Sequence, residues 1–419
     1  MTSKKAYLFL AAFPALLLVI GLLIEPIGAT GAGVIRIITA RSLLLTDYLA
    51  IGGVGATLVN AGVCGLVSVG LVKLNGVQVN GPFIAAVYTV IGFAFFGKNV
   101  YNIWPVFAGV FLYSRIQKTP FRNSLLVALF GTTLAPLVSY FSFVSGLPQP
   151  GGILLGLGFG VVVGFVLPPL ASHMLRFHDG YNIYNIGFTG GIVGSFFVAI
   201  FRSFDFAIAP EILLVERAGL FFELLFLGIF TALIVVGLIV ARSSEHSLAD
   251  GAKRILASTG RLVSDFVHIG GYGATIINMG VMGLLGSAFV FLLGGYFNGP
   301  VIGGLLTVVG FAAFGKHPVN CIPVLIGVVL ASFLKIWDAS TTVVVIAGLF
   351  GTTLAPIAGQ YGPVAGVFAG FFHLSIVMNV GMLHGGINLY NNGFAGGFVA
   401  SFLAPIIDAF KKSESEKKA

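Results

Sequence analysis

The chain carries the same polar sequence blocks twice, 218 residues apart from Asn80 to Asn298. Positions 80–110 and 298–328 share 17 identities in 31, and both stretches begin with Asn-Gly-Pro and continue into Phe-Gly-Lys. Shared apolar composition alone does not produce that agreement, so the blocks record an internal duplication. We therefore predict two equivalent halves that pack on each other, at about residues 1–212 and 213–419.

Three further blocks follow the same repeat. The octapeptide Leu-Phe-Gly-Thr-Thr-Leu-Ala-Pro occurs at 129–136 and again, letter for letter, at 349–356. A His-x-Gly-x-Asn-x-Tyr-Asn-x-Gly-Phe-x-Gly-Gly pattern begins at His178 and at His384, and Gly-Gly-x-Gly-Ala-Thr follows shortly after Asp47 and Asp265. Polar residues that recur inside apolar surroundings are the main candidates for function.

The segments around these blocks are too apolar for a water-soluble protein. Hydrophobic residues make up 57% of the chain and charged residues only 9%, whereas soluble domains carry roughly a quarter charged residues. A membrane crossing needs about 20 residues, so the shorter segments are expected to be half-helices or re-entrant. We predict an all-α integral membrane protein with about seven apolar segments per half, which in the first half lie near 6–26, 51–72, 82–97, 103–114, 123–143, 151–172 and 184–201.

An odd number of crossings in each half would place the halves in opposite orientations, and the basic residues support this. If every segment crosses and the N-terminus lies inside, 16 of the 22 Lys and Arg residues fall inside and 6 outside, as the positive-inside rule requires. Inverted repeats are a common plan of membrane transporters. The expected location is the cell inner (plasma) membrane, multi-pass, with both termini in the cytoplasm.

Composition and motifs also exclude several classes of function. The formal charge of +8 does not indicate a nucleic-acid partner, because the basic residues are scattered or terminal rather than gathered in a stripe. Motifs of zinc proteases, serine hydrolases and phosphate-binding loops are missing from the sequence. We therefore expect neither an enzyme nor a cofactor or metal site. The expected partners are the lipid bilayer and a small polar solute or ion, and a homo-oligomer is left open.

Asn80 and Asn298 each open an Asn-Gly-Pro turn into a short apolar segment. Asn suits a helix N-cap and Pro suits the first helical turn, so the simplest interpretation is structural. The alternative is functional, because a half-helix that begins inside the membrane presents free N–H groups and a positive dipole end to a solute.

Two further polar sets lie in apolar surroundings. The threonine pairs either ease a kink by bonding to their own helix or line a pore. The asparagines around the repeated Tyr-Asn step suit a small polar solute, since amides both donate and accept, and they suit interhelical hydrogen bonds equally. Together with the two Asn-Gly-Pro asparagines, the candidate solute-binding residues are Asn80, Asn298, Thr132, Thr133, Thr352, Thr353, Asn182, Asn185, Asn388 and Asn391.

Four charged residues recur in apolar surroundings. In the predicted topology Asp47 and Lys98 lie toward the outer face, and Asp265 and Lys316 lie toward the inner face. We expect Asp47 to pair with Lys98 and Asp265 with Lys316, because an unpaired charge in a membrane is costly. The sharper alternative is that either Asp carries a coupling ion or proton.

The Asn-Gly-Pro, Phe-Gly-Lys and Tyr-Asn-x-Gly-Phe blocks are spread over nearly the whole chain. With them the sequence resembles an uncharacterised bacterial family of duplicated polytopic membrane proteins, a domain of unknown function, and this resemblance implies a class and no substrate. More loosely, an Asn-Gly turn used twice before a Gly-rich helix is similar to urea-transporter-like channels, which have a Tyr-Asn-Gly turn. Here Val79 or Phe297 precedes the Asn, so urea is not carried over as the substrate.

The preferred function is a membrane transporter or channel for a small polar solute or ion. Transport would be passive or driven by an ion gradient, because the chain has no soluble domain large enough to hydrolyse nucleotide. The site is expected at the pseudo-two-fold axis between the repeats. The alternative is a non-transporting membrane protein, either an assembly partner or an intramembrane lipid enzyme. A continuous polar path along the axis would separate the two.

Overall fold

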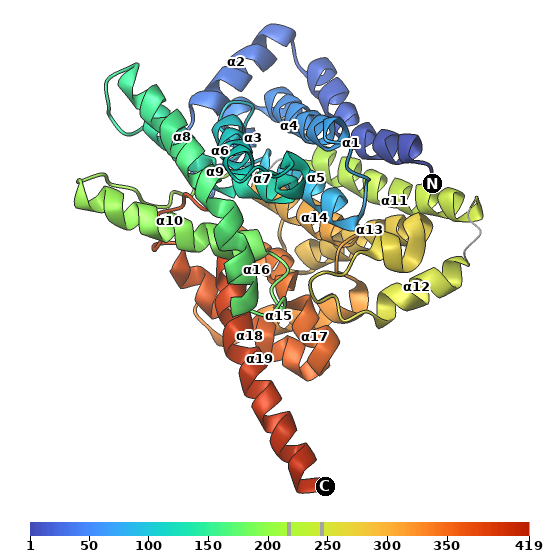
Figure 1. The fold of residues 1–419 in the computed structure, drawn as a ribbon. Coiled ribbons are helices and arrows are strands. Elements are labelled where there is room, and N and C mark those ends of the chain that lie inside the picture. The colour runs from blue at the N-terminus through green and yellow to red at the C-terminus, as the bar shows by residue number, and fades with distance from the viewer. Residues whose placement is uncertain (216–218, 244–246, 419) are drawn as a thin grey trace.

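The computed structural model describes residues 1–215, 219–243 and 247–418, with side chains up to residue 411. These residues form helices joined by short loops, with isolated β-bridges and no strand among them. The first repeat occupies the upper part of Figure 1 and the second repeat the lower part, and α19 extends beyond the body to the C-terminus. Arg217, one of the six basic residues predicted outside, lies outside the described residues.

The first repeat contains α1 (Ser3–Ile24), α2 (Ile27–Thr39), α3 (Tyr48–Gly52), α4 (Val54–Leu74), α5 (Gly81–Phe93), α6 (Ile103–Ile116), η1 (Phe121–Asn123), α7 (Leu125–Gly131), η2 (Thr132–Leu134), α8 (Pro136–Phe143), α9 (Gly151–Phe177) and α10 (Asn185–Ser203). The second repeat contains α11 (Leu220–Arg242), α12 (Leu248–Ala257), α13 (Phe266–Leu292), α14 (Gly299–Phe311), α15 (Pro318–Leu334), α16 (Thr342–Gly351), η3 (Thr352–Leu354), α17 (Ala355–Tyr361), α18 (Pro363–Val380) and α19 (Asn391–Lys418).

The two repeats have the same helix order. Helix α13 corresponds to α3 and α4 together, because both units bend at a glycine with positive φ, Gly53 (φ 86°) and Gly271 (φ 78°). A left-handed backbone costs glycine little and other residues more. Both glycines belong to the repeated Gly-Gly-x-Gly block, so the sequence places the same bend in both halves.

Up to five candidate membrane-crossing units of the described residues fall in each repeat. Nine helices of the described residues are long and apolar enough to cross a membrane, and the pair Leu125–Leu134 and Pro136–Phe143, bent by 45°, makes a tenth if it counts as one span. Helices α5 and α14 have 13 residues each, so at 1.5 Å per residue each covers about 20 Å of a hydrocarbon core of roughly 30 Å. The predicted all-α membrane fold with two repeats and short helices is confirmed.

Helices α2 and α12 lie between the predicted apolar segments and were not expected. In α12 the buried residues are Gly251 and Ile255, while Lys253 and Arg254 on the other face are exposed. An amphipathic helix of this kind suits the membrane interface, with its apolar side on the protein. Helix α12 has ten residues, three of them charged, so its sequence does not have the length or the apolar composition of a crossing segment.

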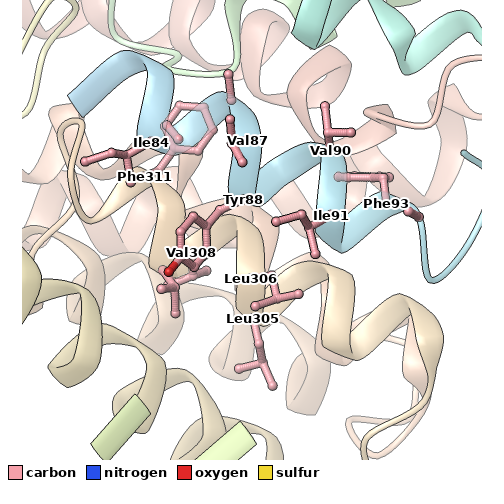
Figure 2. Close-up of a cluster of buried hydrophobic side chains, with 14 of the residues drawn as sticks. Ile84, Val87, Tyr88, Val90, Ile91, Phe93, Leu305, Leu306, Val308 and Phe311 are labelled. Carbon is pink, nitrogen blue, oxygen red and sulfur yellow. The ribbon is translucent and has the colours of Figure 1, made fainter. Parts of the chain in front are cut away.

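Helices α5 and α14 form the centre of the molecule, and every residue of both is buried. Figure 2 shows side chains of α5, including Tyr88 and Ile91, packed against Leu305 and Leu306 of α14. The two helices run antiparallel, because Gly81 at the start of α5 lies against the carbonyl of residue 313, just beyond the end of α14. Protein rather than lipid therefore surrounds both short helices.

The burial of α5 and α14 changes the position expected for two charges. Lys98 follows α5 and Lys316 follows α14, and both side chains are fully buried. They had been assigned to opposite faces of the membrane, and neither belongs to an exposed loop. Removing Lys316 from the residues predicted inside and Lys98 from those predicted outside leaves the excess of basic residues inside unchanged.

Candidate functional site

The N-terminus of each short central helix is closed by an acidic residue of the opposite repeat. The Asp265 carboxylate accepts a hydrogen bond from the Gly81 N–H at 3.0 Å, and the Asp47 carboxylate accepts one from the Gly299 N–H at 3.2 Å. A carboxylate at a helix N-terminus is stabilised by free N–H groups and by the helix dipole. The two aspartates therefore join the repeats and occupy the positive helix ends.

Asn80 and Asn298 cap the same two helices. Asn80 Oδ1 accepts from the Phe83 N–H at 3.2 Å, and Asn298 Oδ1 accepts from the Val301 N–H at 3.0 Å. Asn298 also donates to the Thr342 hydroxyl at 2.7 Å. The helix N-termini thus have protein partners, and the structural interpretation of the Asn-Gly-Pro turns is the one that the geometry supports.

The predicted ion pairs are wrong. The salt bridge found among the described residues joins Arg41 to Glu211 at 2.7 Å. The carboxylates instead bind backbone N–H groups of the opposite repeat, which a search for partners within one half does not consider. This corrects the expected pairing of Asp47 with Lys98 and of Asp265 with Lys316.

The crossing of α10 with α19 is held by an Asn–Thr network. Asn388 Nδ2 donates to the carbonyl of Gly187 at 3.1 Å, and its Oδ1 accepts from the Thr133 hydroxyl at 2.7 Å and from the Tyr390 N–H at 3.2 Å. The equivalent bonds of the other repeat connect Asn182 to Gly393, Thr353 and Tyr184. Both amides have their donor and acceptor atoms engaged across the repeat interface.

Asn185 and Asn391 connect neighbouring helices within each repeat. Asn185 donates to the carbonyl of Ala171 at 3.0 Å and contacts His178 Nε2 at 3.0 Å through its Oδ1. The matching bonds of Asn391 reach Val377 at 3.1 Å and His384 at 2.9 Å. Histidines 178 and 384 thus orient the amides.

Thr132 and Thr352 bond to their own helices, as a residue that eases a kink does. The Thr132 hydroxyl donates to the carbonyl of Leu129 at 2.6 Å, and the Thr352 hydroxyl donates to that of Leu349. Each of the ten predicted solute-binding residues therefore has at least one hydrogen-bond partner in the protein. These hydrogen bonds give the ten residues a structural role, which is sufficient to explain why they recur in both halves.

Lys98 and Lys316 differ from this network, because no carboxylate of the described residues lies within 4 Å of either ammonium. Lys98 Nζ donates to the hydroxyl of Tyr390, whose ring centroid is 4.6 Å away. Lys316 Nζ donates to the hydroxyls of Tyr184 and Thr352, and the Tyr184 ring centroid is 4.5 Å away. Each lysine thus contacts the tyrosine of the opposite repeat, and we call these contacts the Lys–Tyr pairs.

The loops that carry the lysines are fixed by two asparagines. Asn60 Nδ2 donates to the carbonyl of Ala94 at 2.8 Å and to that of Lys98 at 2.9 Å. Asn278 makes the same two bonds, each 2.7 Å long, to Ala312 and Lys316. These bonds satisfy carbonyls at the ends of α5 and α14 and hold each lysine where its helix stops.

A cavity of about 230 Å³ lies between the two repeats. Its wall contains equivalent residues of both halves, so the pseudo-two-fold axis passes through it. Most of these side chains are aromatic or aliphatic. The matched wall residues are Thr89 and Thr307, Phe93 and Phe311, Phe130 and Phe350, Ile183 and Leu389, Tyr184 and Tyr390, Ile186 and Asn392, and Gly187 and Gly393.

The part of the cavity wall that reaches the surface is formed by residues whose repeat counterparts are not in the wall. These residues are Leu126, Val127, Ala171, Ser172, Leu175, Leu262 and Val263. Val263 is 74% exposed, while its repeat equivalent Leu45 is 4% exposed. The inter-repeat linker covers Leu45, which exchanges backbone hydrogen bonds of 3.0 Å with Glu211 and Leu213.

Sequence reasoning located part of this site. Of the ten predicted solute-binding residues, Asn185 lines the cavity. The missed wall residues Tyr184 and Tyr390 belong to the repeated Asn-x-Tyr-Asn block, and that recurrence was the signal that could have found them. The wall also contains the five phenylalanines Phe93, Phe130, Phe311, Phe314 and Phe350. Phe130 and Phe350 belong to the repeated octapeptide, so recurrence could have found them too, although a phenylalanine draws little attention in a chain that has 40 of them.

The comparisons with known proteins agree with the duplication. A family model described as "Protein of unknown function (DUF1576)" matches residues 28–203 and 244–409, one match within each predicted half. No curated protein and no solved structure matches the sequence. The similarity to urea-transporter-like channels therefore has no support from these comparisons. Because the matched residues cover most of the chain, this protein belongs to the DUF1576 family of proteins of unknown function.

Proposed function

We propose that the chain is a membrane transporter for a small solute, which binds in the cavity on the pseudo-two-fold axis. The observation that carries the proposal is the matched wall, in which each repeat contributes residues at equivalent positions to one central space. In transporters built from inverted repeats, the solute site lies at the repeat interface near the bilayer midplane. A purely structural interface has no need of a cavity at this position.

The asymmetric part of the wall supports a transporter over a permanently open channel. The mouth lies beside Arg122, Arg176 and Arg261, basic residues that the sequence assigns to the cytoplasm. At the equivalent position of the other repeat, the linker covers Leu45. We interpret this arrangement as a state open toward the cytoplasm, and exchange of the two repeat conformations would open the other end.

The proposal differs from the sequence-based hypothesis in where the solute binds. That hypothesis placed the solute among the repeated amides, which would form a continuous polar path. The amides are engaged by protein partners instead, and the walls of the cavity are mainly aromatic. A non-transporting role remains the competing hypothesis, and it predicts that blocking the cavity has no effect on solute movement.

Flux into proteoliposomes tests the proposal with two neighbouring substitutions on α9. Ser172 is exposed and lines the mouth, so Ser172→Trp is expected to block the cavity without disturbing the core. His173 is also exposed and lies outside the wall, so His173→Trp is the matched control. Uptake of at least one member of a panel of small acids, amides and amines should fall at least about tenfold in the first variant and stay unchanged in the second.

No uptake of any panel member by the parent protein would refute transport, and so would an equal effect of both substitutions. The proposed orientation has its own measurement. Single cysteines at positions 118 and 338, which are exposed repeat equivalents, should react with an impermeant thiol reagent from opposite sides. The native Cys64 and Cys321 are buried and give little background. Reaction of both positions from the same side would refute the inverted topology.

A further inference from the structure

We infer that the solute is a small organic anion with an apolar body, whose negative group binds between the two Lys–Tyr pairs. The inference rests on the proposed function in one respect, the placing of the solute in the axis cavity. Its own support comes from the charge of the site, the hydrogen-bonding capacity of its tyrosines and the chemistry of its walls.

The site has two buried amino groups and, among the described residues, no carboxylate to pair with them. Lys98 and Lys316 are both fully buried, and in the described part of the chain neither has a carboxylate within 4 Å. The two aspartates that could have neutralised them hold helix N-termini instead. The negative dipole ends of α5 and α14 offset only part of a unit charge. A buried, unpaired ammonium is costly, and an anion in the cavity would supply the missing counter-charge in both repeats at once.

Two tyrosines connect the buried lysines to the cavity wall. Tyr184 and Tyr390 line the wall, and each hydroxyl oxygen accepts a hydrogen bond from a lysine behind it. A hydroxyl whose oxygen accepts a bond still has its own proton to donate. Each Lys–Tyr pair therefore offers an O–H donor with a cation behind it, and such charge-assisted donors favour carboxylate or a similar oxyanion.

The residues of the cavity wall and the cavity volume indicate the chemistry and size of the rest of the ligand. Phe93, Phe130, Phe311 and Phe350 surround the space, and aromatic walls favour an apolar body. An apolar cavity of roughly 150 Å³ holds a benzene molecule, so the present cavity of about 230 Å³ has room for a ring with one small substituent. Among the described wall residues there is no Asp or Glu, so a cationic solute would meet two positive charges and no partner.

Three probes of nearly the same shape and different charge test the inference: benzoate, benzamide and benzylammonium. We would measure equilibrium binding of radiolabelled benzoate to the purified full-length protein, and displacement by the other two compounds. Benzoate should bind saturably, benzamide at least about tenfold more weakly, and benzylammonium should not compete. The Lys98→Met, Lys316→Met double variant should lose at least about tenfold in benzoate affinity, as removal of two nearby charges in a low-dielectric site predicts. Tyr184→Phe with Tyr390→Phe should lose several-fold.

The control removes two exposed charges, with Lys73→Met and Lys118→Met, and should bind benzoate like the parent. No saturable benzoate binding, or benzamide binding as tightly as benzoate, would overturn the anion inference. The two proposals fail separately. Benzoate binding that needs the buried lysines, without flux of any solute, would refute transport and keep the anion site. Flux that Ser172→Trp blocks and the lysine substitutions leave unchanged would keep transport and refute the anion site.

Discussion

Two buried polar regions lie at the interface of the repeats, and they differ in how well their groups are paired. The Asn–Thr network at the crossing of α10 with α19 matches its amide donors and acceptors with protein groups. The Lys–Tyr pairs beside the cavity have hydrogen bonds but no carboxylate within 4 Å in the described structure. Both regions recur in the two halves, so recurrence alone does not separate them. The difference in pairing does separate them: the first region has a structural role, and we propose that the second binds the solute.

The largest loss of stability is expected from the Asn–Thr network. Asn182→Leu with Asn388→Leu leaves carbonyls, hydroxyls and N–H groups of the crossing without partners. The expected loss is about 2–4 kcal/mol in the free energy of unfolding, because each orphaned buried group costs roughly 1–3 kcal/mol and partners found in the unfolded state return part of this. Thermal unfolding in detergent measures it. Asn379→Leu is the control, since Asn379 is exposed and bonds to Ser375 of its own helix.

A smaller loss is expected at the helix ends that join the repeats. Asp47→Ala with Asp265→Ala should cost about 1 kcal/mol per site, the typical value of a helix cap. Asp265→Asn should restore most of the loss at its site, because a single oxygen of Asp265 accepts from the Gly81, Val267 and His268 N–H groups. Asp47→Asn should restore less, because Asp47 accepts from Leu49 with one oxygen and from Gly299 with the other. The same Asn variants decide the ion-coupling hypothesis. Normal stability with lost flux would support coupling through the aspartates, and normal flux would leave them a structural role.

The smallest loss of stability is expected at the first threonine of each pair. Thr132→Val removes a bond to its own helix, and the expected cost is below about 1 kcal/mol. Thr352→Val should cost a similar amount. However, the Thr352 hydroxyl also accepts from Lys316, so benzoate binding should change more in this variant than in Thr132→Val. Equal effects of both substitutions on binding would weaken the role given to Lys316.

Much of the fold follows from the sequence for identifiable reasons. The 218-residue repeat, the apolar segments and the excess of basic residues inside predicted two inverted all-α repeats. The Asn-Gly-Pro turns predicted the starts of α5 and α14, because capping is a local interaction. Cross-repeat partners could not be predicted in this way. The contact of Asp47 with Gly299 joins residues of different halves, and only the antiparallel packing of α5 on α14 brings them together.

The candidate site was located less well, for the same reason. The repeated block drew attention to its amides, such as Asn182, and less to the tyrosine beside them. An amide and a hydroxyl can each hold a helix or bind a solute, and the choice depends on which atoms are already engaged. That information lies in the packing of α10 on α19 and not in the pattern of either helix. The extent of the predicted halves, 1–212 and 213–419, stays a prediction.

The assignment of roles by pairing is tested most directly by the stability of the Lys98→Met, Lys316→Met double variant. Replacing an unpaired buried charge with an apolar side chain of similar length removes a cost. The account therefore predicts an unfolding midpoint in detergent at or above that of the parent protein, together with lost benzoate binding. A fall in the midpoint as large as that of the Asn182→Leu, Asn388→Leu variant would contradict it, because the lysines would then be holding the fold in the same way as the amides.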